Sequence, residues 1–165
     1  MKKSFVRRSL NRILALVARF APGATTLRPF LHKLRGVRIV GQVFIGDDVY
    51  LENEYPECIE IHEGAQICLR STLIAHTRGS GRIVIEKDAF IGAHALLSTT
   101  VGNTLVIGEG AVVVAATVVT ASIPPRTLFG SAKAKALGKV TIPFTINTPY
   151  RKFLSGIRPL DQGKR

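Results

Sequence analysis

Cysteine and tryptophan are scarce in this chain of 165 residues, which has two cysteines and no tryptophan. Cys58 and Cys68 are too few for the framework of several disulfide bridges that staples small secreted domains. They are also too few for a structural zinc site, which takes four ligands at suitable spacing. We therefore expect two reduced thiols, no bound metal and a cytoplasmic protein.

Acidic residues are missing from residues 1–38, which carry ten basic side chains. Residues 126–165 carry nine basic residues and one acid, whereas residues 39–125 carry four basic residues and ten acids. The net charge of +12 therefore describes two basic ends around an acidic middle. A uniform nucleic-acid-binding domain is not expected to show this division, and no aromatic RNA-binding motif is present, so we expect no nucleic-acid partner.

Aliphatic residues recur every six positions through the middle of the chain. They are Ile39, Ile45, Leu51, Ile61, Ile67, Leu73, Ile85, Ile91, Leu97, Ile107, Val113 and Val119. Between successive groups of three, the spacing widens to ten, twelve and ten residues. Hexapeptide periods are typical of a parallel β-helix, in which three short strands close one triangular coil. The alternative, an antiparallel sandwich, would need turns about every 8–12 residues, which would break this period.

Small or β-branched residues follow most of these positions by four, which suits tight inward places near a corner. They are Val49, Ala65, Ser71, Thr77, Ala89, Ala95, Val101, Ala111 and Thr117. The extra residues always follow the third hexad, so segments 52–60, 74–84 and 98–106 are expected to leave the coil at one corner. Since successive loops stack one coil apart, the acidic segment 52–57 is predicted to lie beside the loop 75–82.

The expected fold is all-β, with a parallel β-helix of about four coils over residues 37–125. A basic amphipathic helical cap is expected over 1–36, and a basic extension with an amphipathic helix at 150–158 over 126–165. Six apolar residues of the N-terminal segment fall on one face at helical spacing: Val6, Leu10, Ile13, Leu14, Val17 and Phe20.

Three alternatives are open for this N-terminal helix. It caps the open end of the coil stack or packs on a neighbouring subunit; it lies on anionic lipid at the inner face of the membrane; or it is a cleaved targeting peptide. It is not a membrane span, because its apolar run at 13–18 is short and lies between Arg12 and Arg19.

Among the four histidines, His76 is the candidate for chemistry. His32 lies in the basic segment before the coil, while His62 and His94 follow inward positions, and we interpret all three as structural or solvated. His76 instead opens a Gly/Ser-rich loop beside a carboxylate-bearing segment. An imidazole with an unperturbed pKa of about 6.5 can act as a general base near neutral pH. Glu52 or Glu54 would orient it.

Residues 73–77, Leu-Ile-Ala-His-Thr, and 83–94, Ile-Val-Ile-Glu-Lys-Asp-Ala-Phe-Ile-Gly-Ala-His, resemble the hexapeptide-repeat acyltransferases. This family includes the galactoside, maltose and serine acetyltransferases and the acetyltransferases of surface-polysaccharide synthesis. Residues 118–125 and 134–140 resemble the family's exit from the coil. The resemblance implies a left-handed parallel β-helix, a homotrimer with active sites between subunits, and acetyl-CoA as acyl donor.

The resemblance also implies roles for single residues. The family's catalytic histidine matches His76, and its acceptor-binding asparagine falls on Arg70, which suits an acidic or phosphorylated acceptor. The family's coenzyme A contacts match Ala93, Ala115, Thr120 and Lys135, with Lys133 and Lys139 as neighbouring cations that could share the phosphates.

The predicted function is therefore acetyl-CoA-dependent O-acetylation of a saccharide or a nucleotide- or lipid-linked sugar, without a metal. One alternative is a non-catalytic β-helix that scaffolds an assembly or binds a membrane through its basic ends. Another is a zinc hydratase like the γ-class carbonic anhydrases. That family uses two histidines five residues apart, a spacing that none of the four histidines here has.

Overall fold

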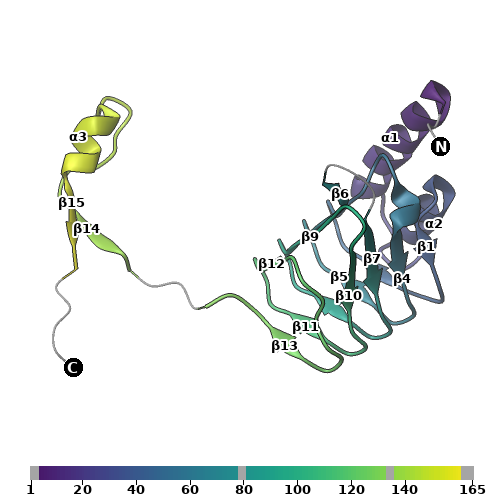
Figure 1. Cartoon of the computed structure of the whole chain (residues 1–165). Helices are drawn as coiled ribbons and strands as arrows, with labels where there is room; N and C mark the ends of the chain where they lie inside the picture. Colours follow the sequence, from purple (N-terminus) through teal and green to yellow (C-terminus); the bar gives the residue numbers. More distant parts are fainter. Residues whose placement is uncertain (1–3, 78–80, 133–135, 161–165) are drawn as a thin grey trace. The chain divides into compact units, whose positions relative to one another are not determined.

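The computed structural model describes residues 4–77, 81–132 and 136–160, and for His76 and Thr77 it describes the backbone. The chain divides into two compact units, Met1–Ser131 and Ala132–Arg165. The first contains the helices α1 and α2 and a stack of coils, and the second contains a strand pair with a short helix (Figure 1). Each unit is described by itself.

The coils of the first unit are built from three parallel sheets within the described residues. Sheet 1 contains β1 (Arg38–Ile39), β4 (Ile59–Ile61), β7 (Arg82–Ile85) and β10 (Thr104–Ile107). Sheet 2 contains β2 (Phe44–Ile45), β5 (Gln66–Ile67), β8 (Phe90–Ile91), β11 (Val112–Val113) and β13 (Leu128–Phe129). Sheet 3 contains β3 (Tyr50–Leu51), β6 (Thr72–Thr77), β9 (Leu96–Thr100) and β12 (Val118–Val119).

The register of these strands confirms the predicted hexapeptide repeat. Ile61 pairs with Ile39 on one side and with Ile85 on the other, and the equivalent residues of sheets 2 and 3 also pair from coil to coil. All twelve predicted inward residues are buried and belong to one hydrophobic core. The chain is therefore a parallel β-helix of about four coils. The pairing of β13 with β11 carries the coil past Pro125, the predicted end, to Phe129.

The small residues four positions after the hexad residues are buried at seven places, as predicted. These are Val49, Ala65, Ser71, Ala89, Ala95, Ala111 and Thr117. The prediction is wrong for Val101, whose side chain is 55% exposed. Val101 follows the third hexad of its coil, where the chain turns outward with Gly102 at φ +74°. The side chain of Thr77, at the equivalent place one coil earlier, lies outside the described residues.

A column of left-handed backbone conformations forms the corner between sheets 2 and 3. Asp48, Arg70, His94 and Ala116 have φ values of 54°, 56°, 60° and 57° and are one coil apart. The backbone links them, since the amide of Arg70 donates to the carbonyl of Asp47 and that of His94 to the carbonyl of Leu69. Arg70 and His94 therefore have a structural role as corner residues.

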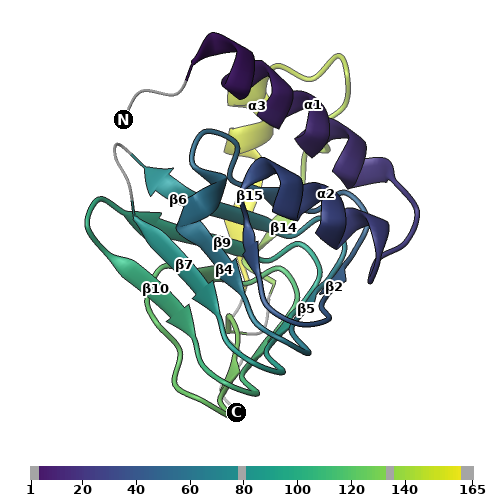
Figure 2. The same ribbon diagram turned by 90° about the vertical axis from the view of Figure 1, so that its right-hand side faces the viewer.

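Two N-terminal helices lie at the end of the stack formed by β1, which is labelled in Figure 1, and Figure 2 shows the same two helices from another side. Helix α1 (Phe5–Phe20) begins after the N-cap Ser4, and α2 (Leu27–Arg35) ends at Gly36, whose φ of +112° suits a glycine C-cap. The buried Arg28 of α2 donates to the carbonyl of Ile45 at 3.0 Å, so the first coil does not end in bare backbone groups there. The predicted helical cap is present, and α2 provides these contacts.

Helix α1 turns its small residues toward the protein. Its buried residues are Asn11, Ala15 and Ala18, whereas its large apolar side chains are mostly exposed. The helix packs through small residues because Arg8, Arg12 and Arg19, on the flank nearest to them, pair with Glu54 and Asp48 of the coil. Among the described residues, no helix is long and apolar enough to cross a membrane.

In the second unit, β14 (Gly138–Val140) pairs with β15 (Ile157–Pro159) in antiparallel fashion. Helix α3 (Tyr150–Ser155) lies between them in sequence, and Phe144 packs against Phe153 with ring centroids 4.9 Å apart. The helix predicted for residues 150–158 is therefore too long by three residues. Its last part is strand, because the carbonyl of Gly156 accepts from the amide of Thr141 at 2.9 Å and the next residues join β14.

Candidate functional site

The segments between sheets 3 and 1 leave the coil at one corner, as the sequence predicts. Strands β6 and β9 extend beyond the hexads toward this corner, with Ile74 beside Ser98 and Thr77 beside Thr100. On the preceding coil, the amide of Glu52 donates to the carbonyl of Leu73 at 3.0 Å. The acidic segment that begins at Glu52 therefore lies next to β6, on the side opposite β9.

The backbone of His76 lies in the extended part of β6, which runs beside β9 and begins where Glu52 of the preceding coil bonds Leu73. Its neighbour Ala75 is fully buried, and the carbonyl of Ala75 accepts from the amide of Gly81 at 2.7 Å, which closes the loop. The imidazole of His76 and residues 78–80 lie outside the described residues. The structure defines the position of the His76 backbone, and the role of His76 as a general base stays a prediction.

The two carboxylates proposed to orient His76 have different surroundings. Glu52 is fully buried, and one of its carboxylate oxygens accepts from the amide of Glu54 at 2.8 Å. The carboxylate of Glu54 binds Arg8 at 2.9 Å and Arg12 at 3.3 Å, and the hydrogen bond from Arg8 holds the pKa of Glu54 below its usual value. Glu54 therefore ties the segment to α1, while Glu52 is buried beside β6. Their part in orienting the histidine stays a prediction.

Arg35 fixes the start of this segment from α2. Its guanidinium donates to the carbonyl of Leu51 at 2.8 Å, to that of Glu52, and to the side-chain oxygen of Asn53 at 3.1 Å. Burial lowers the pKa of Arg35 to about 10, and it lowers the pKa of the adjacent His32 to about 3 with help from the Arg35 charge. His32 is thus a buried neutral side chain, consistent with its interpretation as structural.

A cavity of about 330 Å³ lies between α1 and β3, next to the acidic segment. It is lined by Arg12, Ala15, Leu16, Arg19, Arg35, Val49, Tyr50, Leu51 and Asn53. Three of these residues are arginines, and the buried Nε of Arg35 has no hydrogen-bond partner among the described residues. Arg19 and Arg12 are partly neutralised by Asp48 and Glu54. The cavity thus offers donors for an anionic or hydroxyl-rich group.

Sequence reasoning missed this cavity, although a signal was present. Arg12 and Arg19 are seven residues apart on α1, and Arg28 and Arg35 are seven apart on α2. Residues seven apart lie on the same side of a helix. The spacing therefore indicates that each helix has two arginines on one side, which could face the acidic coil.

Arg70 lies away from the loop corner. It stands at the corner between sheets 2 and 3, before β6 begins, whereas His76 lies near the other end of that strand. The exposed Arg70 side chain comes within 3.7 Å of a carboxylate oxygen of Asp48 on the coil above. The structure therefore places Arg70 and the His76 backbone at opposite ends of sheet 3, and any shared acceptor would have to span this face.

The residues matched to coenzyme A contacts lie at separate places. Ala93 and Ala115 stack one coil apart at the corner between sheets 2 and 3, where the carbonyl of Ala93 accepts from the amide of Ala116 at 2.8 Å. Thr120 follows β12 directly and is exposed. Lys139 is an exposed residue of β14 in the second unit. Lys133 and Lys135 lie outside the described residues.

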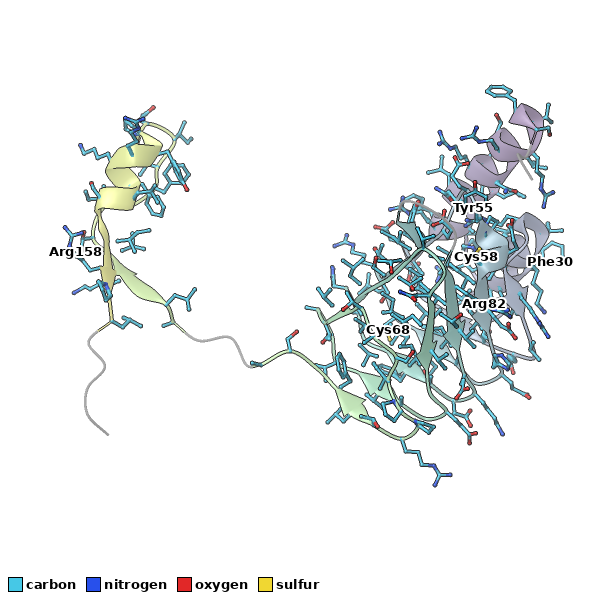
Figure 3. All side chains as sticks on the ribbon, in the orientation of Figure 1. Phe30, Tyr55, Cys58, Cys68, Arg82 and Arg158 are labelled. Atoms are coloured by element: carbon cyan, nitrogen blue, oxygen red, sulfur yellow. The ribbon has the colours of Figure 1, made fainter. Side chains whose placement is uncertain are left out.

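A second polar cluster lies on the outer face of sheet 1. Glu60 of β4 is almost fully buried there by His62 at 2.9 Å, Arg38 at 3.4 Å and Arg82. Burial alone would raise the pKa of Glu60, but the hydrogen bond from Arg82 and the charge of Arg38 outweigh it and leave the pKa lowered. His62 thus takes part in an ion-pair cluster on a coil face. Figure 3 shows Arg82 on this face and Tyr55 and Cys58 in the neighbouring segment between β3 and β4.

Both cysteines are free thiols and partly buried. Burial raises the pKa of the Cys68 thiol. In the described part of the chain, no group of three or more His, Cys, Asp or Glu residues is placed to hold a metal ion. A comparison with protein-family models gives no match, and a comparison with curated proteins gives none either.

Proposed function

We propose that this protein is an acetyl-CoA-dependent O-acyltransferase that modifies a hydroxyl of a saccharide or a related precursor, with His76 as the general base. The observation that carries the proposal is the position of the His76 backbone. It lies on the part of β6 that extends past the coil, beside β9 and three residues after Leu73, the residue that the buried Glu52 bonds. The family resemblance of this stretch supports the same assignment.

In the proposed reaction, the imidazole of His76 takes the proton from the acceptor hydroxyl. The hydroxyl oxygen attacks the thioester carbonyl of acetyl-CoA, and the resulting intermediate collapses as the C–S bond breaks. The acetyl group is then joined to the acceptor oxygen, and the imidazolium returns its proton to the leaving thiolate of coenzyme A. A carboxylate that accepts from the other ring nitrogen would keep the histidine in the required tautomer, and Glu52 is our candidate for it.

The donor is proposed to run past Ala93 and Ala115, which have small side chains and lie one coil apart. Thr120 and the basic side chains of Lys133, Lys135 and Lys139 are the further contacts that the resemblance implies. Phosphates require a reachable positive charge, which the basic extension supplies. We propose a homotrimer, as the resemblance implies, working in the cytoplasm.

For the acceptor, the cavity between α1 and β3 favours a group with negative charge. Its arginines come from α1 and α2, and Tyr50 lies on β3, the strand that precedes the acidic segment beside β6. A phosphorylated or uronic-acid-containing saccharide, or a nucleotide- or lipid-linked sugar, would match these donors better than a neutral glycoside.

The first experiment is a calorimetric titration of the full-length protein with acetyl-CoA. Binding is expected, and its absence would favour the alternative of a non-catalytic scaffold. A screen of sugar phosphates, nucleotide sugars and neutral glycosides with acetyl-CoA then follows thiol release. We expect turnover with anionic acceptors above that with neutral ones.

The matched variants are His76→Ala and His62→Gln. Removal of a general base lowers turnover by roughly 10²–10⁴-fold, so His76→Ala should lose nearly all acetyl transfer while still binding acetyl-CoA. His62→Gln, on another face of the coil, should keep its activity. Unchanged turnover in His76→Ala would end the proposal.

A further inference from the structure

Helix α1 presents its large apolar side chains away from the protein body. The residues packed toward the coil and α2 are small or polar, namely Asn11, Ala15 and Ala18. Seven large apolar side chains of the same helix are 44% to 82% exposed: Phe5, Val6, Leu10, Ile13, Leu16, Val17 and Phe20. On a helix with 3.6 residues per turn, these seven lie nearly opposite the buried three. The helix is therefore amphipathic with its apolar face outward.

Ion pairs hold α1 in this orientation. Arg8 and Arg12 bind Glu54, and Arg19 binds Asp48 with one contact at 2.7 Å. All three arginines lie on the flank between the apolar face and the coil. On the opposite flank, Arg7 donates to the carbonyl of Leu34 in α2 at 3.2 Å. The apolar face is thus bordered on both sides by guanidinium groups.

The neighbouring helix α2 adds to this surface. Its Leu27, Phe30 and Leu34 are 40%, 54% and 47% exposed and lie three and seven residues apart on one face, and Lys33 is exposed beside them. Figure 3 shows Phe30 on the outer side of α2. Together with α1, these residues form what we call the helical face: the exposed apolar side chains of α1 and α2 with their basic rim. Monomeric proteins rarely gather so many exposed large apolar groups on two neighbouring helices unless they bind something there.

The positive charge of residues 1–38 favours an anionic partner for the helical face. Residues 1–38 carry ten basic side chains and no acid. A second copy docked by two-fold symmetry would bring two such basic rims together, which is unfavourable. An anionic bilayer, in contrast, receives apolar side chains at the level of its headgroups and attracts Lys and Arg to its surface.

We propose that the helical face binds the surface of a membrane that contains anionic lipids, with α1 lying in the plane of the interface. The apolar side chains enter the headgroup region, and the exposed Arg7 and Lys33 contact phosphates from its edge. This proposal does not rest on the acyltransferase assignment. It gives a reason for the outward orientation of α1, which the packing of the coil does not require.

The test is sedimentation of the full-length protein with vesicles of phosphatidylcholine alone and of phosphatidylcholine mixed with phosphatidylglycerol. We expect binding to the anionic vesicles, weaker in high salt, and little to the neutral ones. The variant Ile13→Ser/Val17→Ser removes two apolar groups from the helical face, and serine has a similar helix propensity. Its partition should fall at least about tenfold. The control Val114→Ser/Val118→Ser changes two similarly exposed residues of the coil and should bind like the wild type.

Equal binding to both vesicles, or none to the anionic ones, would overturn the proposal. So would unchanged binding of Ile13→Ser/Val17→Ser, with circular dichroism showing that the variant is folded. Sedimentation velocity without lipid provides a further check. If the wild type forms an oligomer that this variant alone loses, the helical face is covered by a second copy and the membrane proposal is wrong.

Discussion

The guanidinium of Arg35 donates to the backbone carbonyl of Leu51 at 2.8 Å, which joins the end of α2 to the last residue of β3. The same guanidinium also reaches the carbonyl of Glu52 and the side chain of Asn53. A single buried side chain thus fixes the point where the acidic segment leaves the coil. Arg35 therefore couples the helical cap to the candidate site, in addition to the ion pairs of Glu54 with α1.

We expect Arg35→Met to lower the free energy of unfolding by about 3 kcal/mol, because buried carbonyls lose their charge-assisted donors and stay unsatisfied. The effect should appear in urea unfolding at neutral pH. Lys33→Met, on the exposed side of the same helix, is the matched control and should change stability little. Equal stability of the two variants would contradict the role given to Arg35.

Acid should destabilise the protein through His32. Burial and the Arg35 charge lower its pKa from 6.5 to about 3 in the folded state, so the unfolded state binds the proton more readily. Its contribution to stability is complete above pH 6.5 and is lost as the pH falls from there toward 3. The free energy of unfolding should decline by up to about 1.4 kcal/mol per pH unit in this window.

The variant His32→Gln separates this effect from other titrating groups. It should be less stable than the wild type at pH 7, because the ring packs at 1% exposure and bonds Arg35. Between pH 6.5 and 5, however, the stability difference between the two proteins should shrink. A difference that stays constant over that range, measured by urea unfolding, would show that His32 is not held neutral.

Much of the fold could be predicted because the inward positions of a coil repeat with a fixed period. Every hexad residue from Ile39 to Val119 is buried, and the register pairs each with its equivalent one coil away. Among the small residues four positions after a hexad residue, Val101 is exposed because it follows a third hexad, where the chain leaves the coil. The period alone does not say where a coil stops and a loop begins.

The orientation of α1 could not be predicted from its amphipathic pattern. The pattern defines an apolar face but not what covers it, and this face is exposed in the structure. The deciding contacts are ion pairs to Glu54 and Asp48, residues more than 25 positions away in sequence. Glu54 and Asp48 come close to α1 only once the coil is folded, so the sequence of the helix does not reveal these ion pairs.

The candidate site was predictable in part. The adjacency of the Glu52 segment and β6 follows from counting residues between hexads, and the hydrogen bond from Glu52 to Leu73 agrees with it. The separation of Arg70 from this corner follows from the same count, since Arg70 precedes β6. The burial of Glu52 and the binding of Glu54 by α1 depend on tertiary contacts that no local pattern records.

The Glu60 cluster should stabilise the coil through its charge. Glu60→Gln leaves Arg38, Arg82 and His62 without their shared carboxylate, and we expect a loss of roughly 1 kcal/mol at pH 7. The pKa of Glu60 is lower in the folded state than in the unfolded state. Its contribution to the free energy of unfolding is therefore complete above the pKa of the unfolded state, and it is lost as the pH falls through the pKa of the folded state. The thermal midpoints of the two proteins should therefore converge in acid. A gap that persists at low pH would show a packing effect instead.

Close stacking of the coils should make Gly92 intolerant of any side chain. A Cβ at this position would lie 2.5 Å from the amide nitrogen of Ala115 and 2.7 Å from the carbonyl oxygen of Val113, both backbone atoms that cannot move aside. The backbone of Gly92 itself is not left-handed, so the expected strain in Gly92→Ala comes from this contact alone. We expect the free energy of unfolding to fall by at least about 2 kcal/mol in chemical unfolding.

Gly110→Ala is the control for conformation: its φ is +63°, but the nearest contact of an added Cβ is 3.6 Å away, at the flexible side chain of Arg126. That variant should lose only about 1 kcal/mol, the usual effect of a left-handed alanine. If Gly92→Ala is no less stable than Gly110→Ala, the coils are not packed as closely as the contacts at Gly92 require.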